Sequence, residues 1–175
     1  MKKLLVLVAA GVALKLFLDS EKGDEVKAYV RDMLGDSLFT KALYYYIQQW
    51  QGKHPMPYDF FNCMNAGAGK NLNWFWKKWF FDPGYPDLAI TSVTKKLKSY
   101  NILITSKGTK PVPIDLTITF VDRTVSKIHR SIEVWERGNS AVTISVPSTQ
   151  KILKVELGST YNVDSNKADN VFVAK

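Results

Sequence analysis

Apolar residues recur at helical spacing between residues 24 and 80. Two stripes have members three or four positions apart: Val26, Tyr29, Val30, Met33 and Leu34, then Phe39, Leu43, Tyr46, Ile47 and Trp50. This spacing places each stripe on one face of an α-helix. Gly35 and Gly52 follow the stripes, where glycine commonly ends helices. A third helix is predicted to begin near Tyr58, and a fourth to cover 72–80 with Asn71 as its cap.

The hydrophobic period changes from helical spacing to two after the turn at residues 82–86, which carries Pro83, Gly84 and Pro86. Apolar and polar residues then alternate, as in half-buried strands. Six strands are predicted, at 88–94, 100–105, 114–120, 125–132, 142–146 and 153–157. Because no helices intervene, we expect an antiparallel β-sandwich. The expected fold class is α+β, with a leader at 1–19, a helical unit at 20–86 and a β-sandwich at 87–175.

The first nineteen residues contain two lysines followed by an apolar run from Leu4 to Leu14. This order is typical of a secretory signal peptide, which would place the protein in the periplasm or outside the cell. Lys15 interrupts the run, and no small-x-small cleavage site follows it. An ordinary buried helix and an artificial start of a truncated gene remain the alternatives, so localisation stays open. Contact with a membrane is expected only if the leader is retained.

Positive charge is spread along the chain. The 175 residues carry a formal net charge of +8, with 11 Lys and Arg against 8 Asp and Glu in residues 1–86 and 13 against 8 in residues 87–175. The longest basic cluster, Lys95, Lys96 and Lys98, has no RNA-binding motif near it. We interpret it as a solvated strand end, and expect no nucleic-acid partner.

The sequence offers few groups for catalysis or metal binding. There is one cysteine, Cys63, and it lies between apolar residues without a neighbouring His or Lys to activate it. The two histidines, His54 and His129, lie in different predicted units. No His-Glu-x-x-His or Gly-x-Ser-x-Gly segment is present, and Gly67–Lys70 is interpreted as a helix-ending loop. We therefore assign no catalytic, metal-binding or cofactor-binding residue.

An aromatic block closes the predicted helical unit. It consists of Trp74, Phe75, Trp76, Trp79, Phe80 and Phe81. Such a block is either an exposed ligand platform or packing material. Because its rings fall into two adjoining helical stripes, we favour packing between the helical unit and the sandwich.

Several segments together resemble a known family. They are KHPMPYDFFN at 53–62, LNWFW at 72–76, WFFDPGYPDLAI at 79–90, LGDSLFTKAL at 34–43 and SEKG at 20–23. Their order resembles the end of the catalytic region, and the following β-sandwich, of zinc aminopeptidases of the alanyl aminopeptidase type, which are HExxH gluzincin metallopeptidases. The resemblance covers residues 20–175 and is strongest over 34–90.

The resemblance also carries departures that bear on activity. Ser20 stands where the family has a tyrosine that stabilises the oxyanion, and its shorter side chain cannot reach as far. The family's zinc motif would lie upstream of this position, and zinc supplies both the nucleophilic water and the Lewis acid. We therefore expect a truncated, non-catalytic homologue or fragment with a structural role and a protein partner at the uncovered helical face. The rivals are an exported sandwich that binds a protein or a glycan, and one piece of a peptidase whose zinc site is on another chain.

Overall fold

The structure is a computed structural model that describes residues 21–158 and 164–174. The predicted leader at 1–19 and Ser20 lie outside the described residues. The chain divides into two compact units, with the boundary between Phe81 and Asp82. Each unit is described by itself.

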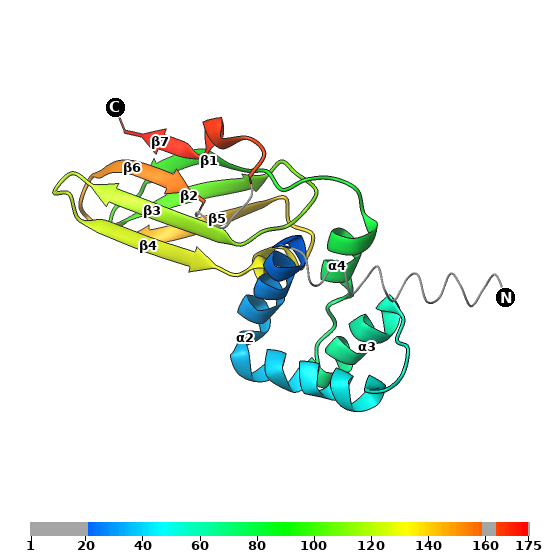
Figure 1. Cartoon of the computed structure of the whole chain (residues 1–175). Helices are drawn as coiled ribbons and strands as arrows, with labels where there is room; N and C mark the ends of the chain where they lie inside the picture. The colour runs from blue at the N-terminus through cyan, green and yellow to red at the C-terminus, as the bar shows by residue number, and fades with distance from the viewer. Residues whose placement is uncertain (1–20, 159–163, 175) are drawn as a thin grey trace. The chain divides into compact units, whose positions relative to one another are not determined.

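The helical unit begins with α2 (Glu21–Trp50), which is interrupted at Gly35. Gly35 has φ 73° and ψ 159°, a backbone conformation that L side chains rarely adopt. The two predicted stripes therefore form two helical segments that meet at a bend, seen in Figure 1 between the blue and cyan parts of α2. The break predicted at Gly35 is confirmed.

Helix α3 (Pro57–Ala68) packs against α2. Its first turn is closed by the Asp59 carboxylate, which accepts a hydrogen bond from the Met56 amide at 2.7 Å. The helix ends at Gly69, as the sequence predicts for this loop. Gly67 lies inside the helix and is buried, and a Cβ atom there would lie 2.6 Å from Ala42 Cα. A glycine at this position therefore permits the close approach of α3 to α2.

The predicted fourth helix is short and changes type. It consists of α4 (Asn73–Trp76), followed by a π-helical segment, η1 (Lys77–Phe81). The prediction that Asn71 is the cap is wrong, since Leu72 occupies the N-cap. Asn71 instead accepts a hydrogen bond from the Asn73 amide at 3.0 Å. The main anchor comes from α3, where Asn65 Oδ1 accepts from the Leu72 amide at 3.2 Å and from Trp76 Nε1 at 3.0 Å.

The second unit is an antiparallel two-sheet structure, which confirms the expected sandwich. Its strands are β1 (Leu88–Lys95), β2 (Ser99–Ser106), β3 (Ile114–Phe120), β4 (Val125–Arg130), β5 (Ala141–Pro147), β6 (Ile152–Leu157) and β7 (Val171–Val173). One sheet has the order β1-β2-β5 and the other β4-β3-β6-β7. The prediction omitted β7 and extended β4 to residue 132, where a 3₁₀ turn, η2 (Ile132–Trp135), begins instead.

The sandwich core follows from the period-two pattern. The inward residues of β3, Ile114, Leu116 and Ile118, are at most 1% exposed. Trp135 closes one part of this core and donates from Nε1 to the carbonyl of Val112 at 2.8 Å. The outward residues Asp115 and Thr117 of β3 are polar, and they line a groove.

Candidate functional site

The helical unit contains an apolar groove with a volume of about 160 Å³. It lies among both segments of α2, α3, α4 and η1, and its lining residues are Val26, Lys27, Val30, Phe39, Leu43, Tyr46, Phe60, Met64, Trp76 and Phe80. Val26 and Val30 form a buried floor, whereas Phe39 and Leu43 are half-buried. Burial, followed by the charges of Cys63 and Asp59, raises the pKa of Tyr46. The groove can accept an apolar side chain.

The aromatic block packs largely within the helical unit. Phe61 of α3 stacks on Trp76 with ring centroids 4.9 Å apart, and its ring lies 4.8 Å from that of Phe80. Phe75 and Trp76 are buried, as packing predicts. Phe81 departs from this pattern, because it is 49% exposed and stacks on Tyr58, which is 59% exposed. One stacked aromatic pair thus faces solvent within this unit.

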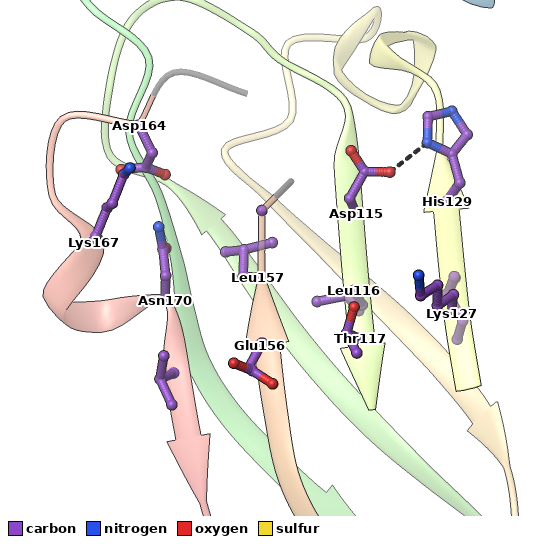
Figure 2. Close-up of a pocket in the computed structure, with 13 residues that line it drawn as sticks. Asp115, Leu116, Thr117, Lys127, His129, Glu156, Leu157, Asp164, Lys167 and Asn170 are labelled. Carbon is purple, nitrogen blue, oxygen red and sulfur yellow. Dashed lines mark hydrogen bonds and ion pairs between the residues drawn. The ribbon is translucent and has the colours of Figure 1, made fainter. Parts of the chain in front are cut away.

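The sandwich carries a polar groove of about 680 Å³ on the outer face of the β4-β3-β6-β7 sheet. Figure 2 shows Asp115 of β3 and His129 of β4, which both line this groove, pointing toward each other. The two residues are register partners, and His129 Nδ1 lies 2.7 Å from Asp115 Oδ1. Farther along the groove, Thr117 pairs with Lys127 on one side and Glu156 on the other. The sequence analysis treated His129 as structural and missed its pairing with Asp115, because the sequence of one strand does not determine its register with the next.

The groove has mixed charge. Lys127 and Lys167 bring positive charge, whereas Asp115, Glu156 and Asp164 bring negative charge. None of the described residues that line it is Phe, Trp or Tyr. This arrangement suits alternating charges and hydrogen bonds on an extended ligand.

The described residues offer no zinc site. No group of three His, Cys, Asp or Glu side chains among residues 21–158 and 164–174 is placed to hold a metal ion. His54 is exposed in the helical unit, and His129 belongs to the sandwich. Cys63 is buried at 8% exposure. Helices long and apolar enough to cross a membrane are also missing from the described part of the chain.

An α-helical unit followed by an antiparallel β-sandwich also occurs in a solved structure. A crystal structure of Legionella pneumophila aminopeptidase A in complex with aspartic acid matches 81% of this chain with a TM-score of 0.62 and 17% identity, over 16% of that protein's chain. Residues 18–79 match the Peptidase family M1 domain. This segment is therefore similar to the M1 domain, as the sequence motifs predict.

Curated relatives agree with this placement. Aminopeptidase N of Lactococcus lactis is 32% identical over 76 residues, which is 43% of this chain and 9% of the relative. Aminopeptidase N of Haemophilus influenzae is 32% identical over 92 residues, which is 52% of this chain and 10% of the relative. Leucine aminopeptidase 2 of Aspergillus clavatus is 29% identical over 108 residues, 55% of this chain and 18% of the relative. The likeness thus spans less than a fifth of each relative's length.

Proposed function

We propose that these 175 residues act as a non-catalytic, structural relative of the M1 aminopeptidases. In this proposal the apolar groove of the helical unit binds a helix from the zinc-bearing part of an aminopeptidase of the same family. The groove is the observation that carries the proposal, because all of its lining residues except Phe80 lie in the segment that matches the M1 domain. A surface that is apolar and partly open is more stable when covered.

The size and chemistry of the groove define what would fill it. An apolar cavity of about 150 Å³ is large enough to bind benzene, so a groove of about 160 Å³ accepts one large apolar side chain. Lys27 is the only charged residue among those described as lining it. An amphipathic helix with a leucine or phenylalanine opposite Val30 and a carboxylate opposite Lys27 fits both features.

The absence of catalysis is tested on the purified chain. Aminoacyl fluorogenic substrates are incubated with the chain and added zinc, with a zinc-only sample as the background. We expect no turnover above that background, because the described residues provide no ligand set for zinc. Turnover that is removed by a chelator would contradict the proposal.

Binding is tested with an M1 aminopeptidase shortened to end before the segment that matches this chain. Leu43→Glu places a charge on the half-buried wall of the groove, whereas Tyr44→Glu alters the next residue, which is 62% exposed and lies outside the groove. Leu43→Glu should weaken binding at least about tenfold, the equivalent of ~1.4 kcal/mol, and Tyr44→Glu should not. Circular dichroism of both variants establishes that they fold. Equal binding by both would refute the groove as the contact. Recovery of activity on mixing would instead favour the rival in which the chain is one piece of an active peptidase.

An exported binding module is the second candidate, and the polar groove of the sandwich favours it. Its mixed charge suits the alternating charges and hydrogen-bonding groups of an extended peptide. Mass spectrometry of the expressed protein tests export. Processing near residue 20 would support this candidate, whereas an intact leader on a protein that stays inside the cell would count against it.

A further inference from the structure

The segment from residue 164 to 174 is held on the sandwich by contacts with the start of β1. Asp164 Oδ2 accepts from the Leu88 amide at 3.1 Å. The Ser165 hydroxyl donates to the Pro86 carbonyl at 2.8 Å, and its amide donates to the same oxygen at 3.2 Å. We call residues 164–174, with these contacts, the C-terminal clasp.

Asp87 lies between Pro86, which accepts hydrogen bonds from the clasp, and Leu88, which donates one to it. It is 8% exposed, and its Oδ1 has no hydrogen-bond partner in the part of the chain that the structure describes. Its backbone carbonyl accepts from the amides of Lys107 and Gly108, at 2.8 and 3.0 Å, which fixes the residue in place. A buried carboxylate without a partner is costly when ionised, so this side chain is better accommodated when it carries a proton.

The acidic residues near Asp87 also favour its protonated form. The clasp brings Asp164, Lys167 and Asp169, and the loop after β2 brings Lys107. Lys107 Nζ donates a hydrogen bond to Asp169 Oδ2 at 2.7 Å. Burial, and then the charges of Asp164 and Asp169, raises the pKa of Asp87, and Lys107 offsets part of this effect.

We propose that the C-terminal clasp is a proton-dependent latch, closed when the Asp87 carboxyl is protonated and loosened when it ionises beside Asp164 and Asp169. A divalent cation is the alternative way to relieve such repulsion. The described residues form no group of three acidic or other ligating side chains suited to a metal, so the proton is the relevant ligand.

Loosening the clasp would alter the sandwich in two ways. β7 belongs to the clasp and pairs with β6, so its release exposes the backbone edge of β6. Asp164, Lys167 and Asn170 line the polar groove and would move with it (Figure 2). The latch would therefore couple pH to the shape of that groove.

The sign of the pH effect follows from the direction of the shift. The pKa of Asp87 in the folded chain lies above its ordinary value of 3.8. The folded state then binds more protons than the unfolded state, and its stability falls as the pH rises through the raised value. The clasp is thus most stable in acid, below the ordinary value, and weaker at neutral pH.

The test compares the full chain with Asp87→Asn, which keeps the shape of the side chain but cannot ionise. The matched control is Asp122→Asn in the same sandwich, because the hydroxyl and amide of Thr124 lower the pKa of Asp122. Thermal midpoints are measured from about pH 3 to about pH 8. Asp87→Asn should raise the midpoint at neutral pH and leave it unchanged in acid, whereas Asp122→Asn should lower it at neutral pH. A neutral-pH midpoint for Asp87→Asn at or below that of the wild type would overturn the proposal.

Two further measurements keep the test decisive even if Asp87→Asn folds poorly. Carboxyl NMR titration of the wild-type chain should place Asp87 above its ordinary value of 3.8, and a midpoint at or below it would refute the latch. Amide exchange at Leu157, whose N–H donates to the Asn170 carbonyl at 2.8 Å, should speed up on ionisation beyond the intrinsic effect of pH. Ca²⁺ is also added to the wild-type chain and to Asp87→Asn. If it raises the thermal midpoint of the wild type but not that of Asp87→Asn, the ligand of the latch is a metal ion and not a proton, which would overturn the proposal.

Discussion

Replacing Asn65 by alanine tests how the helical unit holds its groove. The Asn65 side chain accepts from the Leu72 amide and from Trp76 Nε1, and donates to Asn73 Oδ1 at 2.7 Å. Leu72 is 0% exposed and Trp76 3% exposed, so the truncation leaves two donors in the interior. Each unsatisfied buried donor costs about 1–3 kcal/mol, and entry of water at the half-buried Asn65 reduces the sum. We expect a loss of about 2–4 kcal/mol in the free energy of unfolding.

Urea unfolding followed by circular dichroism measures this loss, with two comparison variants. Asn62→Ala removes an exposed asparagine from the same helix and should change stability by less than about 0.5 kcal/mol. Asn65→Asp keeps the accepting oxygens and loses only the donation to Asn73, so its cost should be smaller than that of Asn65→Ala. The reasoning is refuted if Asn65→Ala unfolds at the same urea concentration as Asn62→Ala.

Three further predictions concern packing, a buried hydrogen bond and pH. Gly67→Ala should destabilise the helical unit by about 1–2 kcal/mol in urea unfolding, because the cost of overpacking, about 1–3 kcal/mol, exceeds the gain of about 1 kcal/mol in helix propensity. A net gain in the free energy of unfolding would show that α2 and α3 separate freely. Trp135→Phe removes the bond to the Val112 carbonyl and should cost the sandwich about 1–3 kcal/mol in thermal unfolding, whereas no change would contradict this account. Thr124→Val removes the hydroxyl that is the first cause of the lowered pKa of Asp122. The stability that this bond contributes is present above the ordinary pKa value of 3.8 and is lost as the pH falls, so the variant should be less stable than the wild type at neutral pH and equally stable in acid. A difference in stability that persists in acid would contradict this prediction.

Elements with a strong hydrophobic period could be predicted from the sequence. The stripe before Gly35 and the alternation in β3 and β6 each bury enough apolar surface to specify one face, whereas the stripe after Gly35 stays half-buried or exposed. The strand β7 could not be predicted, because its three residues are too few to show a period. The cap of α4 was misjudged for a different reason, since Asn65, in another helix, supplies the bonds that Asn71 was expected to make.

The candidate sites were less predictable than the fold. The sequence indicated that the helical face would be apolar, but the groove depends on side chains from four elements. The grouping of Asp115 and His129 depends on the register of β3 and β4. The environment of Asp87 depends on a segment that follows it by more than 75 positions, as the bond between Leu88 and Asp164 shows. Such long-range contacts are set by tertiary packing.

The width of the apolar groove depends on the backbone torsion angles of one residue, Gly35, where α2 bends. Val26 and Val30 come from the segment before it, and Phe39, Leu43 and Tyr46 from the segment after it. A Cβ atom at Gly35 would meet no other atom within 4 Å, so its surroundings leave room for a larger residue. The cost of a substitution there comes from the φ and ψ combination, which is essentially restricted to glycine, and is about 1–3 kcal/mol for an L residue. The change in stability of Gly35→Ala would therefore measure how strongly the chain itself favours this angle between the two segments, independently of any partner that binds in the groove.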